Sequence, residues 1–298
     1  MSAQDAALNS LRRERPEWEP WLVVVDEILR EAGSPAWEAA VPVAAQPQRT
    51  AVPLLAGATL ALDAALVRRL FERLIRTASR AGTPKMSSLK AALRADPEWA
   101  PLFTASLCQD SGRIEEIAAF SGADAEALHA VIALLPVPFL HACNRRWAPS
   151  ISASWVEGYC PVCGSLPAFA EVRGIERNRY FRCGRCGGEW HARALNCPYC
   201  AMSDHDELVA LVPEKTGSTA VGSNAVIEAC QRCLGYVKTF TRLQGCSPTD
   251  VMIEDLASVD LDVAAIEHGF ARPPGPGFAL GITVTDKGAR RGFFAWKS

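Results

Sequence analysis

Eight of the eleven cysteines in this 298-residue chain fall into pairs with CxxC spacing. The pairs are Cys160/Cys163, Cys183/Cys186, Cys197/Cys200 and Cys230/Cys233. Two cysteines separated by two residues can wrap a tight turn that points both thiolates at one ion, so two such turns together complete a tetrahedral site. The spacing therefore predicts that this region binds metal.

Pairing the turns in chain order predicts two four-cysteine sites. The first takes Cys160, Cys163, Cys183 and Cys186, and the second takes Cys197, Cys200, Cys230 and Cys233. Chain order closes shorter loops than an interleaved pairing, which stays the alternative arrangement. Four thiolates suit both zinc and iron, and the spacing does not separate the two ions. Because neither site keeps an open coordination position, we expect structural or electron-transferring sites that do not activate water.

Disulfides and redox catalysis are the other uses of CxxC pairs. Disulfides persist in secreted proteins, but here Arg12-Arg13 is followed by "ERPEWEPW", where an export signal needs an apolar run. We therefore expect a reducing, cytoplasmic location. A thioredoxin-like motif uses a single CxxC, which leaves the other pairs unexplained. No uninterrupted apolar stretch approaches the roughly 20 residues of a spanning helix, so no membrane insertion is expected.

The elements that must position these cysteines divide the chain near residue 150. The clearest helix lies within residues 60–82, where apolar doublets recur at a helical period. Residues 19–33, 112–122 and 124–135 show similar patterns, the last with Asp124 as its N-cap. Beyond residue 150, short strand-like runs end at the CxxC turns. A further helix is expected within residues 253–270, before an irregular tail.

The predicted fold class is α+β, with an N-terminal helical bundle followed by two metal modules of short antiparallel strands, of zinc-ribbon or rubredoxin-like type. The expected domains are residues 1–150 (helical), 151–193 (first CxxC module), 194–245 (second CxxC module) and 246–298 (C-terminal helix and irregular tail). Glycines that follow three of the turns are expected to adopt left-handed backbone conformations; these are Gly164, Gly187 and Gly235.

Charge gives little indication of a partner. The net charge is −2 and 49% of residues are hydrophobic, as in an ordinary globular protein. Six arginines fall between Arg173 and Arg193 among aromatic residues, which resembles a nucleic-acid stripe, but residues 151–250 contain ten basic and ten acidic residues. We interpret the arginines as solvated strand faces or a protein-binding surface, with a zinc-ribbon nucleic-acid-binding regulator as the alternative function. The acidic run from Glu254 to Asp262 is interpreted as an exposed helix face that can also contact a partner.

Isolated candidates have structural interpretations. His191 is interpreted as a packed or hydrogen-bonded hairpin residue with Trp190 on the opposite face, and a place beside a metal site or a partner is the alternative. His129 and His141 are interpreted as structural residues of helices. Cys108 and Cys143 are expected to be buried hydrophobes and Cys246 an exposed thiol. The sequence has no nucleophile elbow, phosphate-binding loop or HExxH motif, so we predict no enzymatic activity and no catalytic residues.

Four stretches together resemble one known family: "YCPVCGSLP", "RYFRCGRCGGEWHARALNCPYC", "EACQRCLGYVK" and "IEDLASVDLDVAAIEHGFARP". From about Tyr159 to Pro273 they look like the FdhE family, the formate dehydrogenase accessory proteins. "CQRCLGY" departs slightly, because Leu234 precedes its glycine.

The resemblance implies a cytoplasmic, non-catalytic maturation factor. It also implies binding to the catalytic subunit of respiratory formate dehydrogenase before that subunit is exported. Two rubredoxin-like modules would hold two metal ions through the eight paired cysteines, with iron favoured and zinc as the other ion. A rubredoxin-type electron carrier is a further alternative function.

Overall fold

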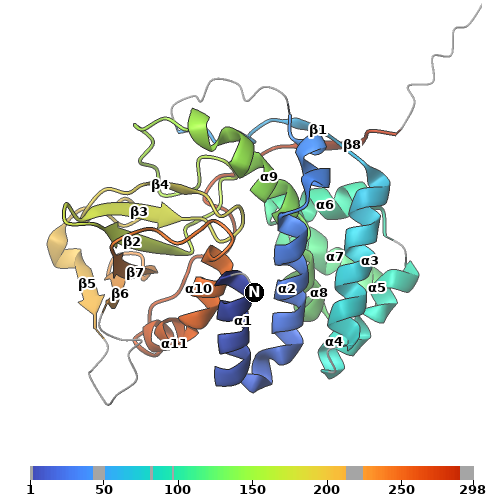
Figure 1. The fold of residues 1–298 in the computed structure, drawn as a ribbon, viewed down its shortest axis with the longest axis horizontal. Coiled ribbons are helices and arrows are strands. Elements are labelled where there is room, and N and C mark those ends of the chain that lie inside the picture. The colour runs from blue at the N-terminus through green and yellow to red at the C-terminus, as the bar shows by residue number, and fades with distance from the viewer. Residues whose placement is uncertain (1–2, 43–50, 81–82, 96, 213–223, 289–298) are drawn as a thin grey trace, which may run out of the picture.

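The computed structural model describes residues 3–42, 51–80, 83–95, 97–212 and 224–288. Helices form the first part of the chain, and a sheet covered by two helices forms most of the rest (Figure 1). The α+β class predicted from the sequence is confirmed. The boundary between helices and strands falls close to residue 150.

The helices of the first part pack around a shared apolar core. They are α1 (Ala3–Glu14), α2 (Glu19–Ala32), α3 (Ala64–Arg80), α4 (Pro84–Ser88), α5 (Lys90–Ala95), α6 (Trp99–Cys108), α7 (Ser111–Ser121), α8 (Ala125–Ile132) and α9 (Val137–Trp147). As predicted, Asp124 caps α8, since its carboxylate accepts a hydrogen bond from the Ala127 N–H at 2.9 Å.

The helix predicted within residues 60–82 begins later than its apolar pattern suggests. The Asp63 carboxylate accepts hydrogen bonds from the N–H groups of Ala65 and Leu66 at 2.8 and 3.3 Å, and so fixes the start of α3 at Ala64. The preceding residues form strand β1 (Thr59–Leu62) instead.

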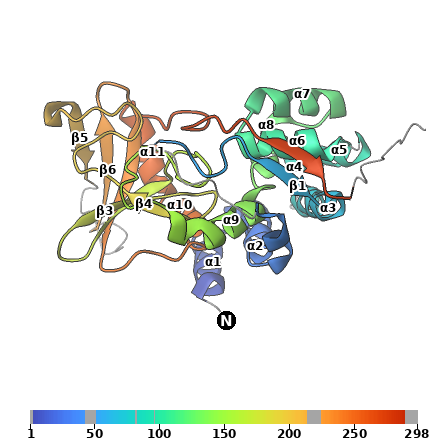
Figure 2. The same cartoon turned by 90° about the horizontal axis from the view of Figure 1, so that it is seen from above.

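The C-terminal tail returns to the helical part. Residues after "RPPGPG" were expected to be irregular, but strand β8 (Thr283–Asp286) pairs in parallel with β1 in the register Thr59↔Thr283 (Figure 2). Leu60 and Leu62 point inward from β1, and both are buried. The last described strand is therefore joined to the helical part through backbone hydrogen bonds.

One helical run has the length of a membrane span. Residues 125–150 qualify by length and composition among the described residues, but 78% of the apolar window is buried inside the protein. Burial to this extent is typical of a helix in the core of a globular protein.

The remaining strands form one six-stranded sheet in the order β4-β3-β2-β7-β6-β5. The strands are β2 (Phe169–Arg173), β3 (Asn178–Arg182), β4 (Glu189–His191), β5 (Leu208–Leu211), β6 (Ala225–Cys230) and β7 (Tyr236–Arg242). Neighbouring strands are antiparallel except β2 and β7, which pair in parallel. That pair joins the two CxxC regions into a single sheet.

Helices α10 (Val251–Ala257) and α11 (Val259–Glu267) cover one face of this sheet (Figure 1). A single helix was expected here, but it breaks at Ser258, whose hydroxyl donates to the Glu254 carbonyl at 2.8 Å. Lys238 of β7 is fully buried beneath them and contacts Asp255 and Asp262 at 2.7 and 2.9 Å.

The four CxxC turns share one backbone geometry. In each, the residue after the second cysteine donates its N–H to the carbonyl of the first cysteine, at 2.9–3.0 Å. That residue has a positive φ in every turn: Gly164 (68°), Gly187 (71°), Ala201 (57°) and Leu234 (58°). The expectation for Gly164 and Gly187 is confirmed, whereas in the fourth turn the left-handed residue is Leu234 and not Gly235.

Gly235 is needed for a different reason. A Cβ atom at this position would lie 2.4 Å from the Tyr199 ring, so only glycine allows the third and fourth turns to approach so closely.

Replacing Ala201 by glycine should stabilise the protein. The left-handed conformation costs a residue with a Cβ roughly 1–2 kcal/mol, and glycine avoids this cost. Glycine also raises the entropy of the unfolded chain, which offsets part of the gain, so the free energy of unfolding should rise by about 0.5–1 kcal/mol. Thermal unfolding at a fixed metal concentration should show a melting temperature higher by about 2 °C. Ala130→Gly, at an exposed position in helix α8, is the matched control and should lower it. A decrease for both variants would contradict this account of the turn.

Candidate metal centres

The fold brings the eight paired cysteines together as two groups of four. Cluster 1 is Cys160, Cys163, Cys183 and Cys186; cluster 2 is Cys197, Cys200, Cys230 and Cys233. Within each cluster all sulfur atoms lie within 4.8 Å of one another. The turns thus group in chain order and are not interleaved.

Sulfur spacing in both clusters has the size of a four-thiolate metal site. The shortest separations are 3.5 Å for Cys160–Cys186, 3.5 Å for Cys163–Cys183, 3.6 Å for Cys197–Cys233 and 3.7 Å for Cys200–Cys230. A tetrahedron with metal–sulfur bonds of about 2.3 Å has edges of about 3.8 Å, whereas disulfide sulfurs lie about 2.05 Å apart. All eight cysteines are free thiols in the structure. The donor sets fit one metal ion each.

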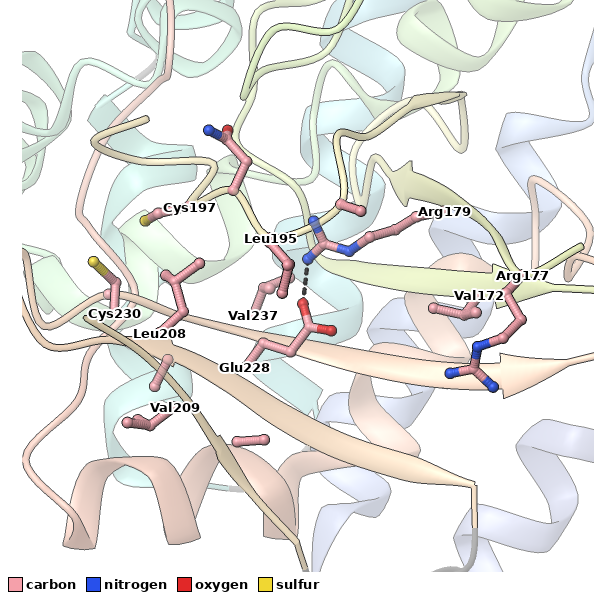
Figure 3. Close-up of a pocket in the computed structure, with 15 residues that line it drawn as sticks. Val172, Arg177, Arg179, Leu195, Cys197, Leu208, Val209, Glu228, Cys230 and Val237 are labelled. Atoms are coloured by element: carbon pink, nitrogen blue, oxygen red, sulfur yellow. Dashed lines mark hydrogen bonds and ion pairs between the residues drawn. The ribbon is translucent and has the colours of Figure 1, made fainter. Parts of the chain in front are cut away.

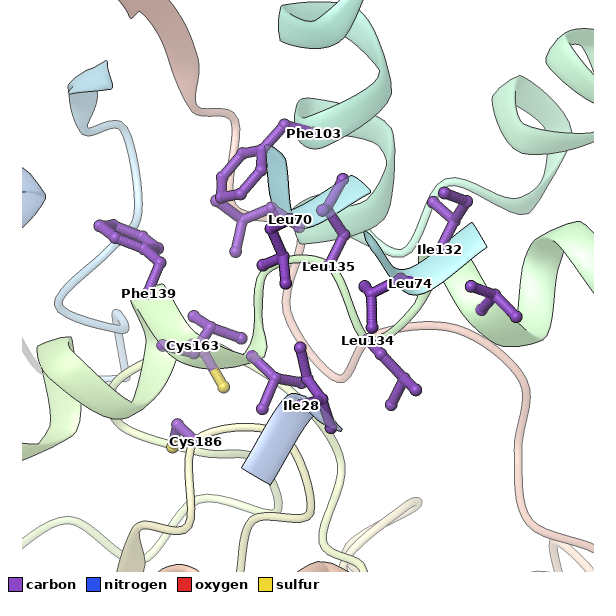
Figure 4. Packing of buried hydrophobic residues seen from close by; sticks show 14 of the residues in the cluster. Ile28, Leu70, Leu74, Phe103, Ile132, Leu134, Leu135, Phe139, Cys163 and Cys186 are labelled. Atoms are coloured by element: carbon purple, nitrogen blue, oxygen red, sulfur yellow. The ribbon is translucent and has the colours of Figure 1, made fainter. Parts of the chain in front are cut away.

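Cluster 1 lies inside the main hydrophobic core. Its four cysteines are fully buried and belong to the same apolar cluster as the helices (Figure 4). Figure 4 shows Cys163 and Cys186 beside Phe139 of α9 and Ile28 of α2. Cluster 1 therefore lies where the helical part meets the sheet.

Polar contacts attach the helical part to the turns of cluster 1. Backbone N–H groups of Leu54 and Leu55 donate to the carbonyls of Pro161 and Val162, at 2.8 and 3.1 Å. Arg185, within the second turn, donates to carbonyls in the last turn of α6, at 2.7 and 3.0 Å. A cation at the C-terminal end of a helix is favourable because it offsets the partial negative charge there.

Cluster 2 is closer to solvent. Cys197 and Cys230 are buried, but Cys200 and Cys233 are partly exposed. Backbone N–H groups of the turns hydrogen-bond to the sulfurs, as those of Tyr199 and Cys200 do to Cys197. Such donors stabilise thiolates and so prepare the site for a cation.

Buried thiols resist ionisation unless a cation is present. Burial raises the pKa of Cys160 in cluster 1 and of Cys197 and Cys233 in cluster 2. Cys163 shifts the other way, because neighbouring thiols, Cys160 first among them, hydrogen-bond to its thiolate and lower its pKa. A bound metal ion would displace the remaining protons, so metal affinity is expected to rise with pH.

Trp190 and His191 alternate across β4 as predicted. Trp190 is buried and donates from its indole N–H to the Glu157 carbonyl at 2.8 Å. His191 is exposed, and its ring lies against Tyr180 with centroids 4.5 Å apart. His191 is therefore a surface residue stacked on its neighbour and not a packed one.

Of the remaining histidine and cysteine candidates, His129 is exposed on α8 and Cys108 is only half-buried, so neither is the buried residue expected. His141 is buried, and burial lowers its pKa to about 4, so it is neutral near pH 7. Cys143 is buried as expected. Cys246 is half-buried, and its pKa rises to about 12, mainly through burial; it is not the freely exposed thiol predicted.

The interpretation of the arginines as solvated residues is wrong for most of them. Arg182 is buried and contacts the fully buried Glu171 at 3.2 Å, and Arg173 and Arg242 also pair with Glu171. Arg185 binds α6, as described above. A buried charge is unfavourable unless it is paired, so these arginines compensate the buried Glu171 and stabilise the interior of the fold.

The acidic run is likewise engaged within the protein. Asp255 and Asp262 each contact Lys238 and Arg272. Burial alone would raise the pKa of Asp255, but Arg272 and Lys238 outweigh it and hold that pKa below its usual value. This run is therefore not simply an exposed helix face.

A cavity beside cluster 2 was not predicted from the sequence. It has a volume of about 310 Å³ and is lined by residues from β2, β3, β5, β6 and β7, together with Arg177 before β3 and the segment after β4 (Figure 3). Cys197 and Cys230 lie at one end of it. Its residues are far apart in the chain, and no local pattern marks them.

Comparisons with known proteins agree with this arrangement. Residues 159–194 match the family model "FdhE, central domain", and residues 195–277 match "FdhE, C-terminal domain". An FdhE homolog from Pseudomonas aeruginosa is 37% identical over 116 residues, which cover 38% of this chain and 37% of that protein. FdhE from Escherichia coli is 32% identical over 117 residues, covering 38% of this chain and 35% of the relative.

The likeness in three dimensions extends further than the likeness in sequence. The crystal structure of the FdhE protein from Pseudomonas aeruginosa matches with a TM-score of 0.56 at 23% identity, covering 92% of this chain and 93% of that one. At this identity the match establishes a shared fold, the helical part included. The central and C-terminal domains of the FdhE family are therefore present in residues 159–277, which contain both sulfur clusters.

Proposed function

We propose that this protein is a non-enzymatic accessory protein for the maturation of formate dehydrogenase, which binds the catalytic subunit in the cytoplasm before export. The observation that carries the proposal is the family match over residues 159–277, the stretch that contains both clusters. The chain spans less than two-fifths of the length of the Pseudomonas aeruginosa and Escherichia coli relatives that it matches, so their role comes to this chain as part of the proposal.

The eight clustered cysteines would bind two ions, which rigidify the partner-binding surface. Iron is the ion that the family resemblance favours, and zinc fits the same four sulfurs. Iron held by four thiolates can exchange one electron, whereas zinc has no redox chemistry. Four protein ligands fill a tetrahedral site, which supports a role without metal-bound substrate.

The surroundings of the clusters bear on two alternative functions, a nucleic-acid-binding regulator and an electron carrier. The internal pairing of Arg173, Arg182 and Arg185 removes much of the basic surface that a nucleic-acid-binding regulator would need. Partial exposure of Cys200 and Cys233 favours the second alternative, an electron carrier of rubredoxin type acting through cluster 2.

The two sites should differ in how readily they release metal. A chromogenic chelator added to the zinc-loaded protein should extract the ion of cluster 2 faster than that of cluster 1, by at least about tenfold, because cluster 1 opens only with the main core. Alkylation during the fast phase, followed by mass spectrometry, should label the cluster 2 cysteines. Equal rates, or earlier labelling of Cys160 and Cys163, would contradict the assignment.

Partner binding can be tested by co-purification. The tagged wild-type protein, produced together with the catalytic subunit of formate dehydrogenase, should retain that subunit. Cys230→Ser removes one ligand of cluster 2 and should reduce the recovered subunit severalfold, since the surface around it loses its metal. Cys246→Ser, outside both clusters, is the matched control and should retain the subunit. Absence of the subunit from the wild-type eluate would overturn the proposed function.

A further inference from the structure

The cavity beside cluster 2 lies where the sheet has no covering helix. The residues that face it from the sheet are Val172 of β2, Ala210 of β5, Glu228 of β6 and Val237 of β7. Strand pairing places them on one face, opposite Lys238 and therefore opposite α10 and α11. A volume of about 310 Å³ with mainly apolar walls and a few charged groups is typical of a binding site.

The sheet edge next to the cavity is available for pairing. Strand β5 is the last strand in the sheet order, so among the described strands it pairs only with β6. Leu208 and Ala210 of β5 line the cavity. An extended peptide that adds to β5 would direct every second side chain over this face of the sheet. Edge and cavity together therefore suit an extended apolar polypeptide segment.

Charge at the far end of the cavity favours an acidic residue in that segment. Arg177 is exposed and forms no ion pair with the described residues (Figure 3). Arg179 pairs with Glu228, but its side chain is only 8% exposed and its Nε is buried without a hydrogen-bond partner in the described part of the chain. The two arginines and Glu228 together give the cavity lining a net positive charge.

Leu195 lines the cavity and is a large apolar residue that is 67% exposed. Exposure of its side chain to water becomes more favourable to lose once another apolar surface covers it.

We propose that β5 and this cavity form the docking site for the client polypeptide, which pairs with the edge of β5 and then continues across the open face of the sheet, with apolar side chains in the cavity and a carboxylate on Arg177. This rests on the proposed function, because the client is the formate dehydrogenase catalytic subunit. Since Cys197 and Cys230 line the cavity, the docked segment also covers cluster 2.

The test measures the affinity of the metal-loaded full chain for the purified catalytic subunit. Ala210→Arg fills the cavity from an exposed position, and Arg177→Glu reverses the charge that meets the client. Each variant should weaken binding by about tenfold or more, as expected for a central contact of an interface. Ala130→Arg and Arg13→Glu make the same changes at exposed positions on α8 and α1, and should bind as the wild type does.

A second measurement separates docking from damage to the fold. Saturating catalytic subunit should slow alkylation of Cys200 and Cys233 in the wild type and leave it unchanged in Ala210→Arg, whose melting temperature should equal that of the wild type. Affinities of both cavity variants within twofold of an intact wild-type affinity would overturn the docking site and leave the proposed function standing. No binding by the wild type would overturn both. Loss of self-association in the variants, with client affinity unchanged, would assign the cavity to a second copy of the chain and overturn the proposal.

Discussion

Four sulfur atoms buried where the helices meet the sheet are the constraint on which the rest of this structure depends. A fully buried group of thiolates is unfavourable without a cation at its centre, and the surrounding apolar residues leave water no place to substitute. The turns that present these sulfurs also receive hydrogen bonds from Leu54 and Leu55 and bind α6 through Arg185. Packing of the helices and assembly of the cluster 1 turns therefore depend on each other.

Buried charges define how the sheet is assembled. Glu171 and Lys238 are both fully buried on adjacent parallel strands, each held by partners from other elements. Removing one partner would leave an uncompensated charge, which usually costs several kcal/mol. A shift of one residue between β2 and β7 would move Glu171 away from Arg242 of β7. These charges therefore help to select a single register for the one parallel contact that unites the two CxxC regions.

The same turn produces two different metal environments. In cluster 1 the turns lie in the main core together with the helices, whereas in cluster 2 they lie beside a sheet face that stays partly open. Identical backbone hydrogen bonds in all four turns show that this difference does not come from the ligands themselves. It comes from what packs around them. One cluster is suited to holding the fold together, and the other lies where a partner can contact it.

Local spacing by itself determined the CxxC turns, the left-handed residues Gly164 and Gly187, the cap at Asp124 and the change from helices to strands, because each depends on residues a few positions apart. Tertiary structure decided the features that depend on distant partners. It placed Arg182 in the interior, split the last helix at Ser258, returned β8 to β1 and assembled the cavity from five strands. Burial and parallel pairing are set by what packs against a segment, and a short stretch of sequence does not encode the identity of that neighbour.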